Sequence, residues 1–109
     1  MAFQSICQPT SILDLSSGSV VELSNKGTTY ESLIYLFPPW NARVVRILQE
    51  SGHDILIDTN DPSVFILWGK PRTTLQLPGT DIGSQIELSS RRNSWVVTNY
   101  VPAIPHHLG

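Results

Sequence analysis

The residues of this chain that could carry out chemistry are few, and the most suggestive pair is His53 beside Asp54. An imidazole next to a carboxylate resembles a general base and the group that orients it. Both residue types are also common in tight turns, and here they follow Ser51-Gly52. Cys7, the single cysteine, has no histidine near it in the sequence, and no Gly-x-Ser-x-Gly motif is present. We therefore expect no catalytic residues and a protein that is not an enzyme.

Side chains that could bind a metal ion occur in two places. The first is an oxygen cluster of Asp54, Asp58, Asn60 and Asp61, which could bind Ca²⁺. It lacks the closing Glu of an EF-hand loop, and strand geometry would separate Asp54 from Asp58 by roughly 13 Å. The second is His106-His107, which could bind a divalent ion on a symmetry axis but is more typical of an exposed chain end. The sequence predicts no bound metal and no other cofactor.

Side chains that could bind a nucleic acid or a sugar are scattered. Arg91-Arg92 could meet a phosphate or an acidic glycan, although two arginines at a turn are ordinarily solvent-exposed. Trp40, Trp68, Trp95 and Tyr100 could form a stacking platform for sugars or bases. Seven Lys and Arg against nine Asp and Glu give a formal charge of −2, without the basic excess that holds a phosphate backbone. We expect no nucleic-acid partner and assign most of these aromatic residues to the core or to a subunit interface.

The elements that position these residues are expected to be strands. Ile, Val and Thr together number 26 whereas Ala occurs three times, a balance that favours strands over helices. The length of 109 residues suits one domain, and 40% hydrophobic residues supply a core. No apolar run approaches the roughly 18–20 residues that span a bilayer, so no membrane insertion is expected. No charged segment followed by an apolar one marks a signal peptide.

Turn signals recur about every eight to twelve residues, which is typical of sandwiches and barrels. We expect an N-terminal arm over residues 1–18, a single β domain over 19–101 and an extended or disordered tail over 102–109. The clearest expected strands are residues 19–24, 55–57, 64–68, 73–77, 84–89 and 95–101.

Two segments, 28–37 and 41–51, are compatible with either a helix or a strand. The first begins with a capping box, Thr28 with Glu31. The second could also be a helix, although its β-branched residues favour a strand. The sequence predicts an all-β fold, a small sandwich or barrel of about eight short antiparallel strands, with one short helix as an alternative within residues 28–50.

Four segments carry a resemblance to a known kind of module. They are a strand at 43–48 followed by Ser51-Gly52, its expected hairpin partner at 54–58, a strand at 74–78, and a closing hairpin at 83–97 that contains Trp95. Together, over about residues 39–100, they resemble small β modules of bacteriophage tail fibres and related adhesins. The turn of the closing hairpin, Ser90 to Asn93, departs from the pattern because it lacks Asp-Gly, which leaves its turn type open.

In the closing hairpin, Trp95 is expected to face Ile86 and Leu88 across the strands and so to fix their register. The resemblance implies a homo-oligomer, commonly a trimer whose apolar faces surround an axis. Only two lysines are available to protect strand edges, which suits a chain whose edges are covered by its copies. The candidate core or interface residues are Trp40, Trp68, Trp95, Ile86, Leu88 and Tyr100.

The resemblance and the lack of a recognisable catalytic group lead to an expected function. The chain would be a non-enzymatic structural component of a phage or virus particle, namely a tail fibre, spike or decoration protein located in the virion. Its partners would be copies of itself, other virion proteins and, if it is adhesive, a cell-surface glycan. One alternative is a monomeric carbohydrate- or peptide-binding β-barrel module. The other is a mixed α/β regulatory or enzymatic domain, which needs helices at 28–37 and 41–51.

Overall fold

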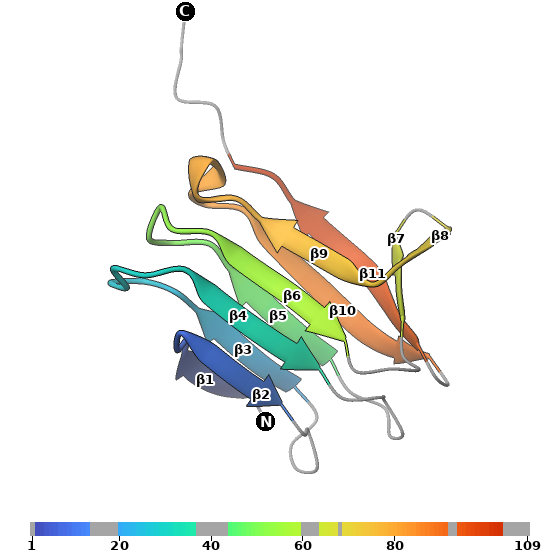
Figure 1. Ribbon diagram of the computed structural model, residues 1–109. Coiled ribbons are helices and arrows are strands. Elements are labelled where there is room, and N and C mark those ends of the chain that lie inside the picture. The colour runs from blue at the N-terminus through green and yellow to red at the C-terminus, as the bar shows by residue number, and fades with distance from the viewer. Residues whose placement is uncertain are drawn as a thin grey trace, which may run out of the picture.

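The computed structural model describes residues 2–13, 20–36, 44–59, 64–67, 69–91 and 94–103. In these residues eleven strands form two sheets that face each other, and one 3-10 helix lies outside the sheets (Figure 1). The expected all-β fold is therefore confirmed. The helical alternative is wrong where the structure describes it, because residues 32–36 and 44–48 are both strands.

The larger sheet, sheet A, has seven strands in the order β1-β3-β5-β10-β11-β7-β8. Their bounds are Ala2–Ile6 (β1), Val20–Ser24 (β3), Val44–Leu48 (β5), Gln85–Arg91 (β10), Ser94–Val101 (β11), Val64–Leu67 (β7) and Lys70–Arg72 (β8). Sheet B has four strands in the order β2-β4-β6-β9. These are Thr10–Leu13 (β2), Ser32–Leu36 (β4), Ile55–Thr59 (β6) and Thr74–Leu77 (β9), and the 3-10 helix η1 spans Gly79–Asp81.

The first six strands wind back and forth between the two sheets. Each odd-numbered strand from β1 to β5 joins sheet A, each even-numbered strand from β2 to β6 joins sheet B, and neighbours within a sheet are parallel. Each turn of the winding thus adds one strand to sheet A and one strand to sheet B, as in a β-solenoid. Residues 2–13, the greater part of the expected arm, supply the edge strands β1 and β2 of this winding.

The winding ends after β6. β9 pairs antiparallel with β6 in sheet B, while β10 pairs antiparallel with both β5 and β11 in sheet A. β7 then extends sheet A parallel to β11, and β8 pairs antiparallel with β7 at the outer edge. The C-terminal half therefore closes the winding with strands of reversed direction.

Two details of the expected fold need correction. Five of the nine described pairings are parallel, and eleven strands are present where about eight antiparallel ones were expected. The segment 54–58 is not the hairpin partner of 43–48, because β5 and β6 belong to different sheets. The physical reason is that the turn at Ser51-Gly52, where Gly52 has a φ of 90°, carries the chain across to the other sheet.

Alternating side chains fill the space between the sheets. In β4 and β5, every second residue is buried, as a strand with one face on a core requires. The described core consists of Cys7, Leu23, Ile34, Leu36, Val45, Ile47, Ile55, Ile57, Phe65, Leu75, Leu77, Ile86, Leu88 and Trp95. No helix in the described part of the chain is long and apolar enough to cross a membrane.

Candidate functional site

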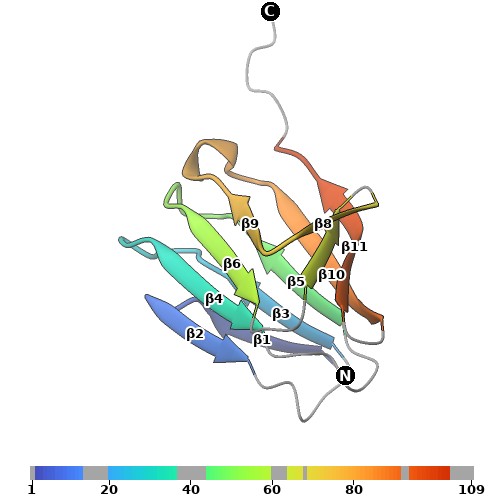
Figure 2. The same ribbon diagram turned by 45° about the vertical axis from the view of Figure 1, so that its right-hand side comes forward.

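One end of the molecule presents an edge strand of each sheet. β1 is the edge of sheet A and β2 is the edge of sheet B, and both lie at the N-terminal end of the winding (Figures 1 and 2). Their sequences, Ala-Phe-Gln-Ser-Ile and Thr-Ser-Ile-Leu, contain no charged residue and no proline. We call this surface, formed by residues 2–6 and 10–13, the open end.

The backbone of β1 shows which groups the open end offers. The N–H of Cys7 donates to the carbonyl of Ser24, the last residue of β3, over 2.8 Å. Because successive N–H groups of a strand point to opposite sides, the N–H of Ile6 is directed away from β3. The Ile6 side chain is 54% exposed, which is the largest exposure among the described large hydrophobic residues. The open end thus combines outward backbone donors with an exposed apolar side chain.

The opposite edge of sheet A has a different composition. β8 consists of Lys70, Pro71 and Arg72, and all three residues are exposed. Proline has no N–H to donate, and two cations on a strand repel a second copy of that strand. This edge therefore carries the features with which natural sheets prevent edge pairing, and the open end lacks them.

A buried polar column lies where the chain leaves sheet A. Asn25 follows β3 and Gln49 follows β5, so the two side chains stack on neighbouring turns of the winding. The Asn25 Nδ2 donates to Gln49 Oε1 over 2.7 Å and to the His53 carbonyl over 3.0 Å. The Gln49 Nε2 donates to the carbonyls of His53 (2.7 Å) and Leu77 (2.9 Å). Both side chains are fully buried.

This column fixes the turn that follows β5. Gln49 Oε1 also accepts the N–H groups of Ser51 and Gly52, and Asn25 Oδ1 accepts that of Glu50 over 2.6 Å. Amide side chains do not titrate, so the column binds backbone rather than performing acid–base chemistry. Sequence reasoning missed it, and the available signal was that Asn25 and Gln49 each directly follow an apolar strand.

Cys7 occupies the equivalent position after β1 and is fully buried. Burial raises the pKa of its thiol to about 11, so the thiol is protonated at neutral pH. The Tyr30 hydroxyl donates to the Cys7 carbonyl over 2.8 Å. A protonated, buried thiol is a poor nucleophile, and its contacts indicate a structural role.

His53 and Asp54 both make hydrogen bonds that hold neighbouring segments, namely the turn after β5 and the start of η1. The His53 carbonyl accepts the two amide donors of the column, and its N–H donates to Ser51 Oγ over 3.1 Å. Asp54 directs one carboxylate oxygen to the N–H of Gly79 (2.7 Å) and the other to Gln76 Nε2 (3.3 Å). The Asp54 carboxylate thus fastens the start of η1 to sheet B.

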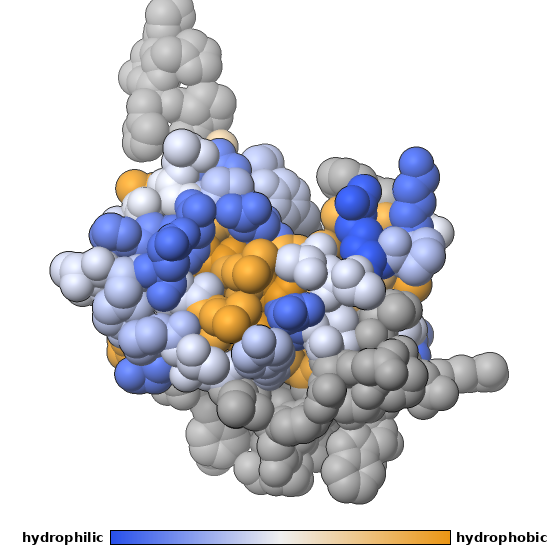
Figure 3. All heavy atoms as spheres, viewed as in Figure 1, coloured by the Kyte–Doolittle hydropathy of each residue, from blue (hydrophilic) through white to orange (hydrophobic). Residues whose placement is uncertain are grey.

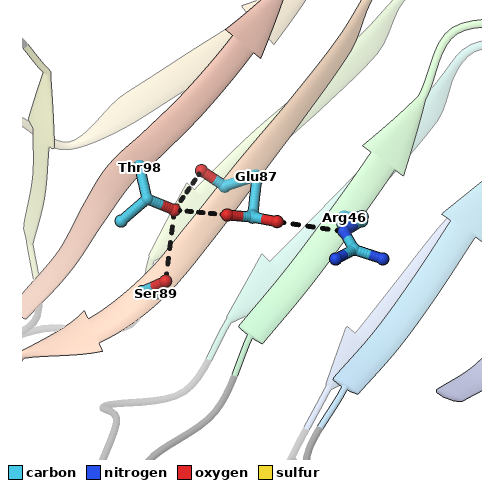
Figure 4. A network of polar contacts seen from close by, with 4 residues as sticks. All are labelled: Arg46, Glu87, Ser89 and Thr98. Atoms are coloured by element: carbon cyan, nitrogen blue, oxygen red, sulfur yellow. Dashed lines mark hydrogen bonds and ion pairs between the residues drawn. The ribbon is translucent and has the colours of Figure 1, made fainter.

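The outer face of sheet A carries the main charged contact (Figure 4). Arg46 Nε of β5 and Glu87 Oε2 of β10 form an ion pair at 3.0 Å. Thr98 of β11 donates to Glu87 Oε1 over 2.8 Å, and the hydroxyls of Thr98 and Ser89 lie 3.1 Å apart. The hydrogen bonds from Arg46 and Thr98 lower the pKa of the Glu87 carboxyl. These contacts tie three neighbouring strands together across their outer face.

The outer face of sheet B is more apolar. Leu33 of β4 lies opposite Leu56 of β6 in the parallel register. Leu56 is 37% exposed, Leu33 and Tyr35 are half-buried, and apolar atoms gather over this face in Figure 3. This patch offers apolar contact but no cluster of polar groups.

The metal candidates are not brought together where the structure describes them. Asp58 uses Oδ1 to accept the N–H of Thr59 over 2.9 Å. Among the described residues no group of three or more His, Cys, Asp or Glu side chains could hold an ion. The remaining candidates, Asn60, Asp61 and His106-His107, lie outside the described residues.

The aromatic and arginine candidates are also dispersed. Trp95 is fully buried and Tyr100 is 39% exposed. Trp95 lies opposite Ser90 rather than opposite Ile86 or Leu88, because it is the second residue of β11 and therefore pairs beside the hairpin turn, where Arg91 faces Ser94. All three hydrophobic side chains nevertheless share the core.

Arg91 is exposed at the end of β10, and its carbonyl accepts the Ser94 hydroxyl over 3.1 Å. Trp40, Trp68 and Arg92 lie outside the described residues. No protein-family model matches the chain, and comparison with curated proteins likewise finds no match.

Proposed function

We propose that this chain is a non-enzymatic structural protein of a phage or virus particle that assembles with copies of itself. The observation that carries the proposal is the open end, where both sheets present uncharged edge strands. An exposed, uncharged strand edge is a template for pairing with another chain. Self-assembly gives such an edge a function.

The contrast within sheet A supports this argument. The β8 edge carries Lys70, Pro71 and Arg72, so protective residues occupy one edge and are absent from the other. The groups that could have served catalysis also hold the fold: Asp54 fastens η1, and Cys7 is buried and protonated. These contacts favour a structural protein over an enzyme.

The virion assignment rests on the resemblance of residues 39–100 to tail-fibre modules. Its closing hairpin corresponds to β10 and β11, which pair antiparallel as in that pattern, whereas the hairpin expected between 43–48 and 54–58 is not formed. The resemblance also implies three copies and places other virion proteins and a cell-surface glycan among the partners. The position of the gene tests this assignment, because capsid or tail genes on either side are expected and metabolic neighbours would overturn it.

Light scattering after size-exclusion chromatography tests self-assembly directly. At micromolar concentration we expect the mass of a homo-oligomer, and the same measurement counts the copies. A mass near the 12.1 kDa of one chain would overturn the proposal.

The open end also favours a second candidate, a monomeric module that binds an extended peptide by strand addition. That module would remain a single chain in light scattering and would bind peptide saturably. An oligomer that binds no peptide would exclude it.

A further inference from the structure

We infer that two copies of this chain meet head to head at the open end, where β1 and β2 pair antiparallel with the edge strands of the second copy. This inference rests on the proposed self-assembly and specifies its surface, symmetry and partner. A two-fold axis turns one copy end over end, so the strands that meet run in opposite directions. Both sheets would then continue across the interface.

The composition of the edges selects a second copy as the partner. Where a two-fold axis places a strand against its own copy, a charge near the axis would face a like charge. β1 and β2 contain no charged residue, and self-pairing brings no such repulsion. Pairing would also cover the exposed side chain of Ile6, which lies at the end of β1.

The opposite edge of sheet A argues against a head-to-tail arrangement. There the strand that would meet β1 of the next copy is β8, which carries Pro71 between two cations. Proline has no N–H to donate, so a head-to-tail contact would lack a backbone hydrogen bond at β8. A head-to-head pair involves β1 and β2 and leaves β8 out of the contact. The head-to-head contact uses the same surface of both copies, so no further copy can add to that surface. The contact therefore yields an even number of copies rather than the three that the resemblance implies.

Two matched substitutions in sheet B test the surface. Thr10 of β2 and Gln76 of β9 are both exposed and stand at opposite ends of one cross-strand row that runs through Leu33 and Leu56. Thr10→Lys places a charge on the open end, and Gln76→Lys places the same charge on the far edge. We expect Thr10→Lys to raise the dissociation constant of the pair at least about tenfold and Gln76→Lys to change it less than about threefold.

Ile6→Lys gives a second test in sheet A, since Ile6 is exposed on β1 and its replacement removes no core contact. It should dissociate the pair as Thr10→Lys does, and circular dichroism should show that both variants retain the strand content of the wild type. A wild-type oligomer that survives both substitutions would overturn the head-to-head pairing and leave self-assembly standing. A monomeric wild type would overturn self-assembly itself.

Discussion

The buried column shows how two amide side chains can organise the turn that follows β5. Gln49 touches the backbone of both the turn after β5 and the strand β9, and Asn25 links the preceding turn of the winding to it. Each buried donor and acceptor that these amides satisfy would otherwise be left without a partner. The fold therefore depends on the hydrogen bonds of two uncharged amide side chains.

Replacing Gln49 by Leu should test that dependence, because it keeps the volume but removes every polar atom. The carbonyls of His53 and Leu77 and the Asn25 amide would each lose a buried partner. We expect the free energy of unfolding to fall by about 3 kcal/mol, measured by urea denaturation. Gln8→Leu, at an exposed position, is the control and should stay within about 0.5 kcal/mol of the wild type.

The ion pair of Glu87 predicts a pH dependence of stability. The pKa of Glu87 is lower in the folded chain than its usual value of 4.5, so its ionised form stabilises the folded state above that value. The contribution is lost as the pH falls through the folded pKa. Since Arg46 is 43% exposed, we expect less than about 1 kcal/mol.

The measurement compares the wild type with Glu87→Gln by chemical denaturation at pH 7 and pH 3. The variant should be less stable at pH 7, and the difference should shrink at pH 3. Glu31→Gln, at an exposed residue, serves as the control. An equal difference at both pH values would show that the carboxylate charge contributes nothing.

At the scale of elements, the sequence specifies which face of each strand is buried but not the direction of its neighbour. Alternation in β4 and β5 places Ile34 and Val45 inside, and the structure agrees. Parallel pairing follows from the winding, whose register steps by 18 residues from Ala2 to Val20 and by 24 from Val20 to Val44. In sheet B the register steps by 23 residues twice, from Thr10 to Leu33 and from Leu33 to Leu56, so the steps are unequal in sheet A alone and no single period runs through both sheets.

The burial of Asn25 and Gln49 escaped prediction for a related reason. Asparagine beside Lys26-Gly27 is ordinarily a solvent-exposed turn residue, and only the stacking of one turn of the winding on the next buries it. The edge strands are different, since the lack of charge in residues 2–6 and 10–13 is visible in the sequence. What the sequence alone did not give was their place at one end of the molecule.

The contact between η1 and the turn at Gly52 predicts an intolerant glycine. A Cβ on Gly79 would lie 2.0 Å from the Gly52 carbonyl oxygen, whereas a Cβ on Gly27 would meet nothing within 4 Å. Gly79→Ala should therefore lower the free energy of unfolding by at least about 2 kcal/mol. Gly27→Ala, whose cost comes from its positive φ alone, should cost about 1 kcal/mol. Thermal and urea unfolding of the two variants would show which one loses more stability. Equal losses in the free energy of unfolding would show that the backbone near Gly79 shifts easily to admit the Cβ.

At the scale of the whole molecule, stability should decrease toward the open end in a single chain. β5 and β10 each have a hydrogen-bonded neighbour on both sides, whereas β1 has one neighbour, β3. In a stacked architecture the terminal unit opens most easily because it has one interface fewer. Head-to-head pairing would give β1 a second neighbouring strand. The protection of the β1 amides from hydrogen exchange therefore indicates whether two copies have paired.

Amide hydrogen exchange in the wild type and in Thr10→Lys makes this a measurable difference. The N–H of Ile6 is directed away from β3, and among the described residues no other strand pairs with β1 on that side, so we expect a partner strand to protect this amide from exchange. We expect this amide to exchange slowly in the wild type and at least about tenfold faster in Thr10→Lys, while the amide of Leu88 in β10 exchanges slowly in both. Equal exchange of Ile6 in the two proteins would place the contact between copies elsewhere.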